Sequence, residues 1–244
     1  MSIRLKNVEK RIAAAIAHYW KTLGSQAGRQ AAGSADRGHR SAVTGGKQMY
    51  GFCELVCEFL KENGLPTEHI HIDAKLDLPG YFRASKVWDM LVVQDGRLLA
   101  ALEFKSQRGP SFGNNFNNRT EEAIGTAVDL WTAYREGALG KKNPRPWLGW
   151  LMLLEDSAES TAPVNVKESH FPAFPEFRGA SYAKRYELLL RRLVLERLYD
   201  RAGFLMATEK NGPRGIYTEP ASDLNIKQFL SGLIGHVAAL TATK

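Results

Sequence analysis

The chain has 244 residues, of which 44% are hydrophobic and 24% charged, and its formal net charge is +7. This length suits one large domain with a buried core, and the positive charge favours a polyanionic partner without identifying DNA. We find no apolar run of about 20 residues and no signal peptide, so we exclude a membrane-spanning protein and expect a soluble, cytoplasmic one.

The N-terminal part divides into a predicted helix and a segment without apolar periodicity. Residues 3–23 carry apolar side chains at helical spacing, which predicts an amphipathic helix. Residues 24–47 contain mainly Gly, Ala and Ser with scattered arginines, and we interpret them as a flexible basic loop. Two interpretations stay open for this loop: a mobile surface segment, or an arm that becomes ordered on DNA.

A second helix is predicted over residues 48–63, because Gly64 and Pro66 follow it as a typical helix end. Cys53 and Cys57 lie four residues apart on this helix, which indicates two reduced core thiols rather than a disulfide. Glu54 and Glu58 lie one turn apart on the same helix.

Two neighbouring apolar runs, residues 87–93 and 98–105, predict an antiparallel hairpin over about 87–105. Each run contains one acid, Asp89 and Glu103, and Lys105 follows two residues after the second. Burying a charge costs several kcal/mol unless it is compensated, and a divalent cation is the usual compensation. The alternative is an edge hairpin whose charges face solvent.

The length of the turn decides whether the two acids meet. A two-residue turn would turn Asp89 away from Glu103, whereas a three-residue loop, Asp95-Gly96-Arg97, would place them directly opposite. Opposed residues share a face, with Cβ atoms roughly 5 Å apart. We therefore predict the three-residue loop, or another odd-length one, with Lys105 on the same face.

The remaining elements complete an α/β fold with a mixed central sheet flanked by helices and extra N- and C-terminal helices. Residues 148–154 form a continuously apolar run that is typical of a central strand. The other predicted elements are a helix at 120–136, a helix at 181–201, a strand at 204–208 and a helix from about Ser222. The apolar stripe of the last helix indicates core packing or, less often, a dimer face.

Asp89 and Glu103-Phe104-Lys105 resemble the motif of the PD-(D/E)XK nuclease superfamily, with Trp88 in the place of its usual proline. More narrowly, residues 101–119 and the segment 51–55 resemble the XhoI-type type II restriction endonucleases. The resemblance extends along most of the chain. It implies a single nuclease domain over residues 1–244 with a restriction-endonuclease-like core.

The resemblance also implies a magnesium-dependent mechanism. Asp89, Glu103 and the main-chain carbonyl of Phe104 would bind Mg²⁺, a hard ion that prefers oxygen ligands. Lys105 would orient the attacking water or neutralise the pentavalent phosphorane. Glu54 is a further catalytic candidate that would hold a second ion or its water shell. The number of metal ions, one or two, stays open.

By the same resemblance the substrate is double-stranded DNA, cut at the palindrome CTCGAG after its first C. A palindrome implies a twofold homodimer, and a companion DNA methyltransferase would act on the same site. We expect DNA contacts from amide and cationic side chains after the catalytic strand and from a basic loop further on, although the asparagines could equally be turn formers. The candidates are Gln107, Arg108, Asn114, Asn115, Asn117, Asn118, Arg119, Lys141, Lys142 and Arg145.

Three other functions remain as alternatives. The first is a nuclease of the same superfamily that recognises DNA structure or acts in repair. The second is a zinc hydrolase, because His69-x-His71-x-Asp73 superficially resembles a metal-binding motif. The third is a DNA-binding module with a vestigial nuclease site.

Overall fold

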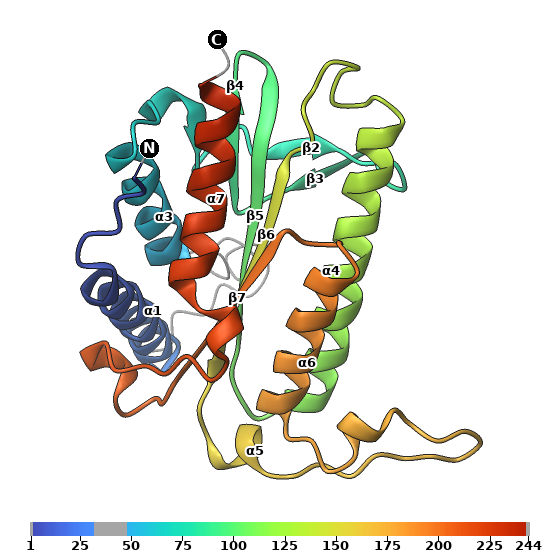
Figure 1. Ribbon diagram of the computed structural model, residues 1–244. Helices are drawn as coiled ribbons and strands as arrows, with labels where there is room; N and C mark the ends of the chain where they lie inside the picture. The colour runs from blue at the N-terminus through green and yellow to red at the C-terminus, as the bar shows by residue number, and fades with distance from the viewer. Residues whose placement is uncertain (1, 32–47, 243–244) are drawn as a thin grey trace.

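A mixed sheet forms the centre of the computed structural model, which describes residues 2–31 and 48–242 (Figure 1). Within these residues the sheet has five strands in the order β1-β4-β5-β6-β7, with β1, β4 and β5 antiparallel and β5, β6 and β7 parallel. The strands are β1 (Ile70–His71), β4 (Met90–Gln94), β5 (Arg97–Gln107), β6 (Trp147–Glu155) and β7 (Arg201–Ala207). A separate ribbon pairs β2 (Asp77–Pro79) with β3 (Ser85–Val87).

Helices cover both faces of the sheet, which confirms the predicted α/β class (Figure 1). One face carries α1 (Val8–Ala31), α3 (Tyr50–Glu62) and α7 (Ile226–Thr241), and the other carries α4 (Phe112–Arg135) and α6 (Tyr182–Leu195). The short helices are α5 (Ala158–Thr161), η1 (Thr67–His69), η2 (Pro175–Phe177), η3 (Gly212–Arg214) and η4 (Ser222–Leu224). None of the helices in the described ranges is both long and apolar enough to cross a membrane.

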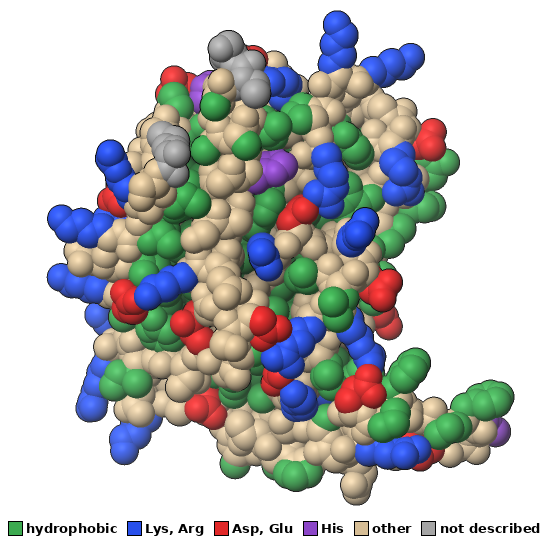
Figure 2. Space-filling model, in the orientation of Figure 1, with side chains coloured by type: hydrophobic (Ala, Val, Ile, Leu, Met, Phe, Trp, Pro, Cys, Tyr) green, Lys and Arg blue, Asp and Glu red, His purple; other side chains and the backbone are tan. Residues whose placement is uncertain are grey.

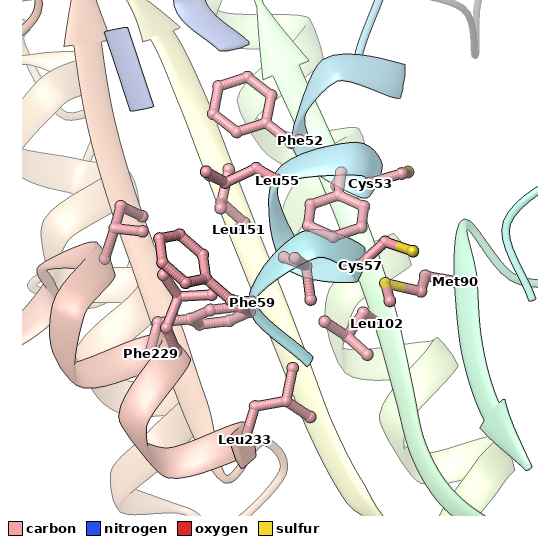
Figure 3. Packing of buried hydrophobic residues seen from close by; sticks show 14 of the residues in the cluster. Phe52, Cys53, Leu55, Cys57, Phe59, Met90, Leu102, Leu151, Phe229 and Leu233 are labelled. Carbon is pink, nitrogen blue, oxygen red and sulfur yellow. The ribbon is translucent and has the colours of Figure 1, made fainter. Parts of the chain in front are cut away.

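The apolar core next to α3 packs against β4 and β5 (Figure 3). Phe52 and Phe59 of α3 are fully buried and belong to the same apolar cluster as Phe229 of α7 and Leu102 of β5. Burying side chains of this size stabilises the packing by roughly 1.5–3 kcal/mol each. The two cysteines of α3 are free thiols and are buried in the same layer. Alternate residues of β5 therefore face α3 and α7, and the others face α4.

The hairpin turn is shorter than predicted, but Asp89 still comes to lie opposite Glu103 as predicted. Asp95 and Gly96 form a two-residue turn, and both have positive φ, as a type I′ turn requires. A bulge at Leu99 then shifts the register by one residue. The paired residues are Gln94 with Arg97, Val93 with Leu98, Val92 with Ala100, Leu91 with Ala101 and Met90 with Leu102. Extending this register by one step places Asp89, which lies just before β4, opposite Glu103.

The first strand of the predicted hairpin is interrupted. Residues 85–87 pair with β2 instead of continuing into β4, and the chain leaves the strand conformation at positions 88 and 89. Val87 is consequently 68% exposed, although its place in the apolar run predicted burial.

The bounds of the first helix, of the helix before β7 and of the last helix differ from the predictions; the last one, α7, begins at Ile226 after a short 3-10 turn, η4. The first helix begins at Val8 and continues through Ala31, so residues 24–31 are not a loop; residues 32–47 lie outside the described part of the chain. Ala, Gln and Arg in this segment are adequate helix formers. The helix predicted at 181–201 ends at Leu195, and Arg197 with φ 57° redirects the chain into β7.

Helix α4 starts eight residues before its predicted start at position 120 and contains the asparagine-rich segment that we expected to be a loop. Asn has a weak helix propensity, but tertiary packing outweighs it here. Phe112 is buried, and Phe116 one turn later makes an edge-to-face contact with Tyr186, at 5.0 Å between ring centroids.

Two glycines provide a matched test of the packing around β6. A Cβ at Gly149 would lie 2.3 Å from the buried ring of Trp147, whereas a Cβ at Gly125 of α4 would meet no atom within 4 Å. We predict that Gly149→Ala lowers the free energy of unfolding by about 1–3 kcal/mol through overpacking. Gly125→Ala should raise it by about 0.5–1 kcal/mol, because alanine is the better helix former. Urea unfolding of both variants would measure this, and equal effects would contradict the packing described.

Candidate active site

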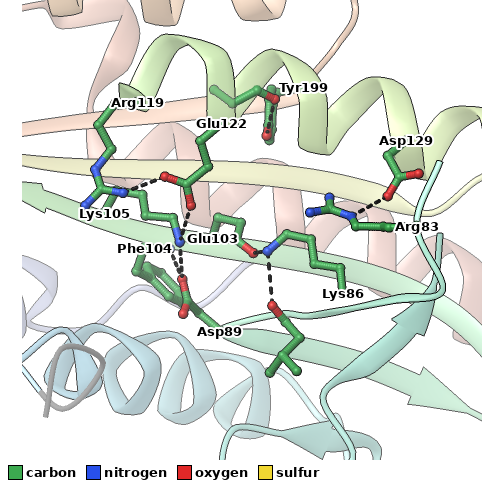
Figure 4. Close-up of polar contacts among 12 residues, drawn as sticks. Arg83, Lys86, Asp89, Glu103, Phe104, Lys105, Arg119, Glu122, Asp129 and Tyr199 are labelled. Carbon is green, nitrogen blue, oxygen red and sulfur yellow. Dashed lines mark hydrogen bonds and ion pairs between the residues drawn. The ribbon is translucent and has the colours of Figure 1, made fainter. Parts of the chain in front are cut away.

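Three of the predicted catalytic residues meet on the face of the sheet that α4 covers (Figure 4). Glu103 and Lys105 lie on this face of β5, and Asp89 precedes β4. The ammonium group of Lys105 forms an ion pair with Glu103, and its Nζ lies 3.6 Å from Oδ2 of Asp89. Lys105 therefore lies between the two carboxylates, in a space that favours a cation.

Glu103 is the deepest member of the cluster, with a side chain that is only 1% exposed. Lys86 of β3 reaches its Oε1 at 2.5 Å, and Lys105 reaches its Oε2. Neither oxygen has a hydrogen bond of normal geometry, so the compensation is ionic. Burial, together with the charge of Asp89, raises the pKa of Glu103 above its ordinary value, although the two lysines oppose this shift.

Helix α4 contributes a third acid, Glu122, which we did not predict. Its Oε1 lies 3.1 Å from Nζ of Lys105, and its Oε2 accepts from Arg119 at 2.5 Å. Burial alone would raise the pKa of Glu122, but Lys105 and Arg119 lower it below the ordinary value. Correctly predicting the start of α4 could have revealed Glu122, since it lies one turn after Arg119. Lys86 carried no comparable signal in the sequence.

The cluster is electrically balanced. It combines three acids with three bases, namely Asp89, Glu103 and Glu122 with Lys86, Lys105 and Arg119. Burial lowers the pKa of Lys105, but the surrounding carboxylates outweigh it and raise the pKa above its ordinary value. The ammonium group is therefore firmly protonated at neutral pH.

Asp89 is fixed from two sides. Its Oδ2 accepts a hydrogen bond from the backbone N–H of Phe104 at 2.7 Å, and the thiol of Cys53 donates to its carbonyl at 3.7 Å. Its side chain remains 32% exposed, so it links the buried Glu103 to solvent. Glu54 follows Cys53 on α3 and is exposed; among the described residues it has no hydrogen bond or ion pair with the cluster.

The donor set fits a hard cation. Asp89 and Glu103 supply carboxylate oxygens, and an ammonium group already lies between them. Mg²⁺ is commonly held by one or two carboxylates and completes its shell with water and phosphate oxygens. In the described residues, no three His, Cys, Asp or Glu side chains are grouped so as to hold a metal ion. This finding applies equally to His69, His71 and Asp73 and to the three acids around Lys105.

The predicted DNA-contact residues near the cluster fall into an exposed and a buried group. Asn114, Asn117 and Asn118 are exposed along one side of the first turns of α4, and Asn115 is partly buried. Gln107 is buried, where it donates to the carbonyl of Phe112 at 3.0 Å and accepts from Tyr186. Both ends of its amide are bonded within the fold, so we do not propose Gln107 as a DNA contact. Arg108 is partly exposed and pairs with Glu209 at 3.2 Å.

The basic loop before β6 lies at the other end of α4. Lys141 and Lys142 are exposed, whereas Arg145 pairs with Asp200 at 2.5 Å and lies 4.4 Å from the ring centre of Trp131. Asn143 is buried and fixes the loop through hydrogen bonds to the backbone of Leu98. On the side of the molecule that Figure 2 shows, basic side chains are spread out and mixed with acids rather than gathered into one patch.

A clamped loop lies beside the cluster, between β2 and β3. Asp129 of α4 accepts hydrogen bonds from the backbone N–H groups of Tyr81 and Phe82, both at 2.8 Å, and from Nε of Arg83 at 2.7 Å. A Cβ at Gly80 would lie 2.7 Å from the Asp129 carboxylate, so the close approach requires glycine. Burial would raise the pKa of Asp129, but these hydrogen bonds lower it below its ordinary value.

Comparison with known proteins gives consistent matches. A family model described as restriction endonuclease XhoI matches residues 28–219. The type II restriction enzyme BstVI of Geobacillus stearothermophilus is 53% identical over 219 residues, which cover 88% of this chain and 97% of the relative. The type II restriction enzyme XhoI of Xanthomonas vasicola is 53% identical over 161 residues, covering 65% of this chain and 64% of that one. No solved structure matches the chain significantly.

The Asp129 clamp predicts a pH-dependent stability. The pKa of Asp129 is lowered in the folded state, so its contribution is complete above the unfolded value of about 3.9 and is lost as the pH falls through the folded value. We expect Asp129→Asn to lower the free energy of unfolding by about 1–3 kcal/mol at pH 7. The difference from the unsubstituted protein should shrink below about pH 4. Urea unfolding measured across this range tests it, and a constant difference would contradict the clamp.

Proposed function

The chain belongs to the XhoI family of type II restriction endonucleases, and on this premise we propose that Asp89, Glu103 and Lys105 carry out Mg²⁺-dependent hydrolysis of DNA. The observation that supports the proposal is the buried carboxylate of Glu103, which shares one ammonium group with Asp89. A structural role alone does not require two acids and a lysine to converge where one of the acids, Asp89, is still 32% exposed.

In this proposal, Asp89, Glu103 and the carbonyl of Phe104 would hold the ion. When bound, Mg²⁺ supplies Lewis-acid stabilisation of the phosphate and activates water for attack. The hydrogen bond from the Phe104 N–H keeps one oxygen of Asp89 in place, and α3 supports the backbone behind it. The protein thereby orients both carboxylates before the ion arrives, which reduces the cost of assembling the site.

Lys105 has two roles in the proposal. In the structure it neutralises the two carboxylates. During the reaction its ammonium group would orient the attacking water or neutralise charge on the reacting phosphate. Glu122 would allow Lys105 to move from one role to the other, because it offers the ammonium group a further acceptor 3.1 Å away. Lys86 stays with Glu103 and offsets the cost of its burial.

The DNA contacts proposed for this enzyme lie on α4 and the basic loop. Amide side chains can read adenine in the major groove, and lysines contact phosphates without reading sequence. The exposed side of the first turns of α4 would supply the base contacts, and Arg108 would contact a nearby phosphate. The remaining candidates are Asn115, Arg119, Lys141, Lys142 and Arg145.

The finer specificity rests on resemblance to the XhoI family. We propose the palindrome CTCGAG as the target, cut after its first C by a homodimer in which each subunit cuts one strand. A companion methyltransferase acting on the same sequence would protect the cell's own DNA. Glu54 remains a candidate for a second ion or its water shell.

Single substitutions in the cluster should separate cutting from binding. We expect Asp89→Ala and Lys105→Ala to cut DNA at least about 100- to 1,000-fold more slowly while retaining DNA affinity, because they remove charge stabilisation at the reacting phosphate. Chelation of divalent metal with EDTA should abolish cutting, and added Mg²⁺ should restore it. Lys227→Ala is the matched control, since Lys227 pairs with Glu9 elsewhere on the surface. Cutting by Asp89→Ala at the normal rate would refute the assignment.

The ends of the products test the specificity. We expect a long defined DNA, incubated with the protein and Mg²⁺, to give fragments whose sequenced ends all derive from CTCGAG. A different fixed sequence would reject this target and retain the enzyme class. Ends located at junctions or damaged sites instead would favour the structure-specific alternative.

A further inference from the structure

Two exposed aromatic rings stand beside the catalytic cluster on the clamped loop between β2 and β3. Tyr81 is 54% exposed and Phe82 is 69% exposed, and their rings make an edge-to-face pair with centroids 5.0 Å apart. Neither ring belongs to the two buried apolar clusters of the fold. Adjacent exposed aromatic rings offer an apolar surface to a partner.

The loop that carries these rings is rigidly built. The nearly buried carboxylate of Asp129 holds the backbone N–H groups of both aromatic residues, and Arg83 completes the clamp. Gly80 permits the close approach of the chain to Asp129. Because the backbone that carries the rings is held, less conformational freedom remains to be lost when the rings bind a partner.

The loop is also fixed relative to the catalytic centre. Three residues after Arg83, Lys86 pairs with Glu103, and Asp89 follows after three more. Asp129 lies seven residues after Glu122 on α4, which is about two helical turns or 10.5 Å along the axis. That distance corresponds to about three steps of the DNA backbone, at roughly 3.4 Å per nucleotide.

The loop itself carries little net charge, because Arg83 and Lys86 are paired with Asp129 and Glu103. A contact made by the two rings would therefore depend on stacking rather than on charge. Given the spacing of Glu122 and Asp129 on α4, a duplex bound at the cluster would place bases within a few steps of the loop. Aromatic rings stack on bases of any sequence, and apolar wedges can enter between base steps.

We propose that Tyr81 and Phe82 form an aromatic wedge that stacks on or between bases of the bound DNA, a few nucleotides from the phosphate that is cut. The inference rests on the proposed function, because it takes DNA at the Asp89–Glu103 cluster as given. In this arrangement Asp129 is a positioning residue that acts through the loop. The wedge holds the DNA in register with the cluster and distorts it locally.

The first test measures binding without divalent metal, so it does not depend on cutting. A duplex that carries CTCGAG, with 2-aminopurine replacing one adenine, is titrated with the protein. We expect Tyr81→Ala/Phe82→Ala to bind about 10- to 100-fold more weakly. The rise in 2-aminopurine fluorescence seen with the unsubstituted protein should disappear. Unchanged affinity together with an unchanged fluorescence signal would overturn the proposal.

Three further variants show why the double variant loses DNA affinity. Phe82→Trp keeps a stacking face and should retain affinity and signal. Ile216→Ala removes an apolar side chain that is 54% exposed, as Tyr81 is, and should leave the affinity and the fluorescence signal unchanged. Asp129→Asn should weaken binding by roughly 3- to 10-fold while the rings are retained, because the loop loses its pre-organisation. Failure of Phe82→Trp to retain binding would contradict stacking.

Three further outcomes decide between this inference, a subunit contact and a failure of the proposed function. If the double variant sediments as a monomer where the unsubstituted protein is a dimer, the rings form a subunit contact and the wedge is rejected. If the unsubstituted protein cuts DNA with Mg²⁺ and the double variant cuts with the same kcat and KM, the inference fails and the proposed function stands. If the unsubstituted protein cuts no DNA, the proposed function fails, and the binding test still decides whether the rings contact DNA.

Discussion

The structure depends on one buried carboxylate. Glu103 lies on the central strand of the sheet with 1% of its side chain exposed, where a lone negative charge would cost several kcal/mol. Two ammonium groups balance it, and the surrounding ion pairs extend the balance to six side chains from β3, β5, α4 and the segment before β4. The same arrangement that makes the buried charge tolerable also brings together the carboxylates that we propose as magnesium ligands. Stability and the proposed catalysis thus depend on the same cluster.

The position of this cluster follows from the packing of the sheet. Apolar side chains of β5 alternate with Glu103 and Lys105, so one side of the strand is fixed by α3 and α7 while the other presents charges to α4. The bulge at Leu99 and the short I′ turn together bring Asp89 toward Glu103. Helix α4 then crosses the charged side and supplies Glu122, and two turns further it supplies Asp129. A single helix therefore connects the proposed catalytic cluster to the clamped aromatic loop.

The sequence predicted the class of fold and the three residues at the centre of the site, because buried acids in apolar strands are energetically costly. It did not predict how the register is achieved, since a two-residue turn with a bulge and a three-residue turn both bring Asp89 near Glu103. The start of α4 was misjudged because the helix propensity of asparagine is weak, whereas Phe112 and Phe116 pack on a distant helix. Lys86, Glu122 and Asp129 act across elements far apart in sequence, and only the folded chain brings them to the site.

The location of the metal tests the account most directly. Iron(II) substituted for magnesium, with ascorbate and peroxide, releases hydroxyl radicals that cut the polypeptide close to the ion. We expect cuts next to Asp89, around Glu103–Lys105 and in α4 near Glu122, and we expect Glu103→Gln to abolish them. Cuts confined to the region of His69–Asp73, or cuts that persist in Glu103→Gln, would contradict it.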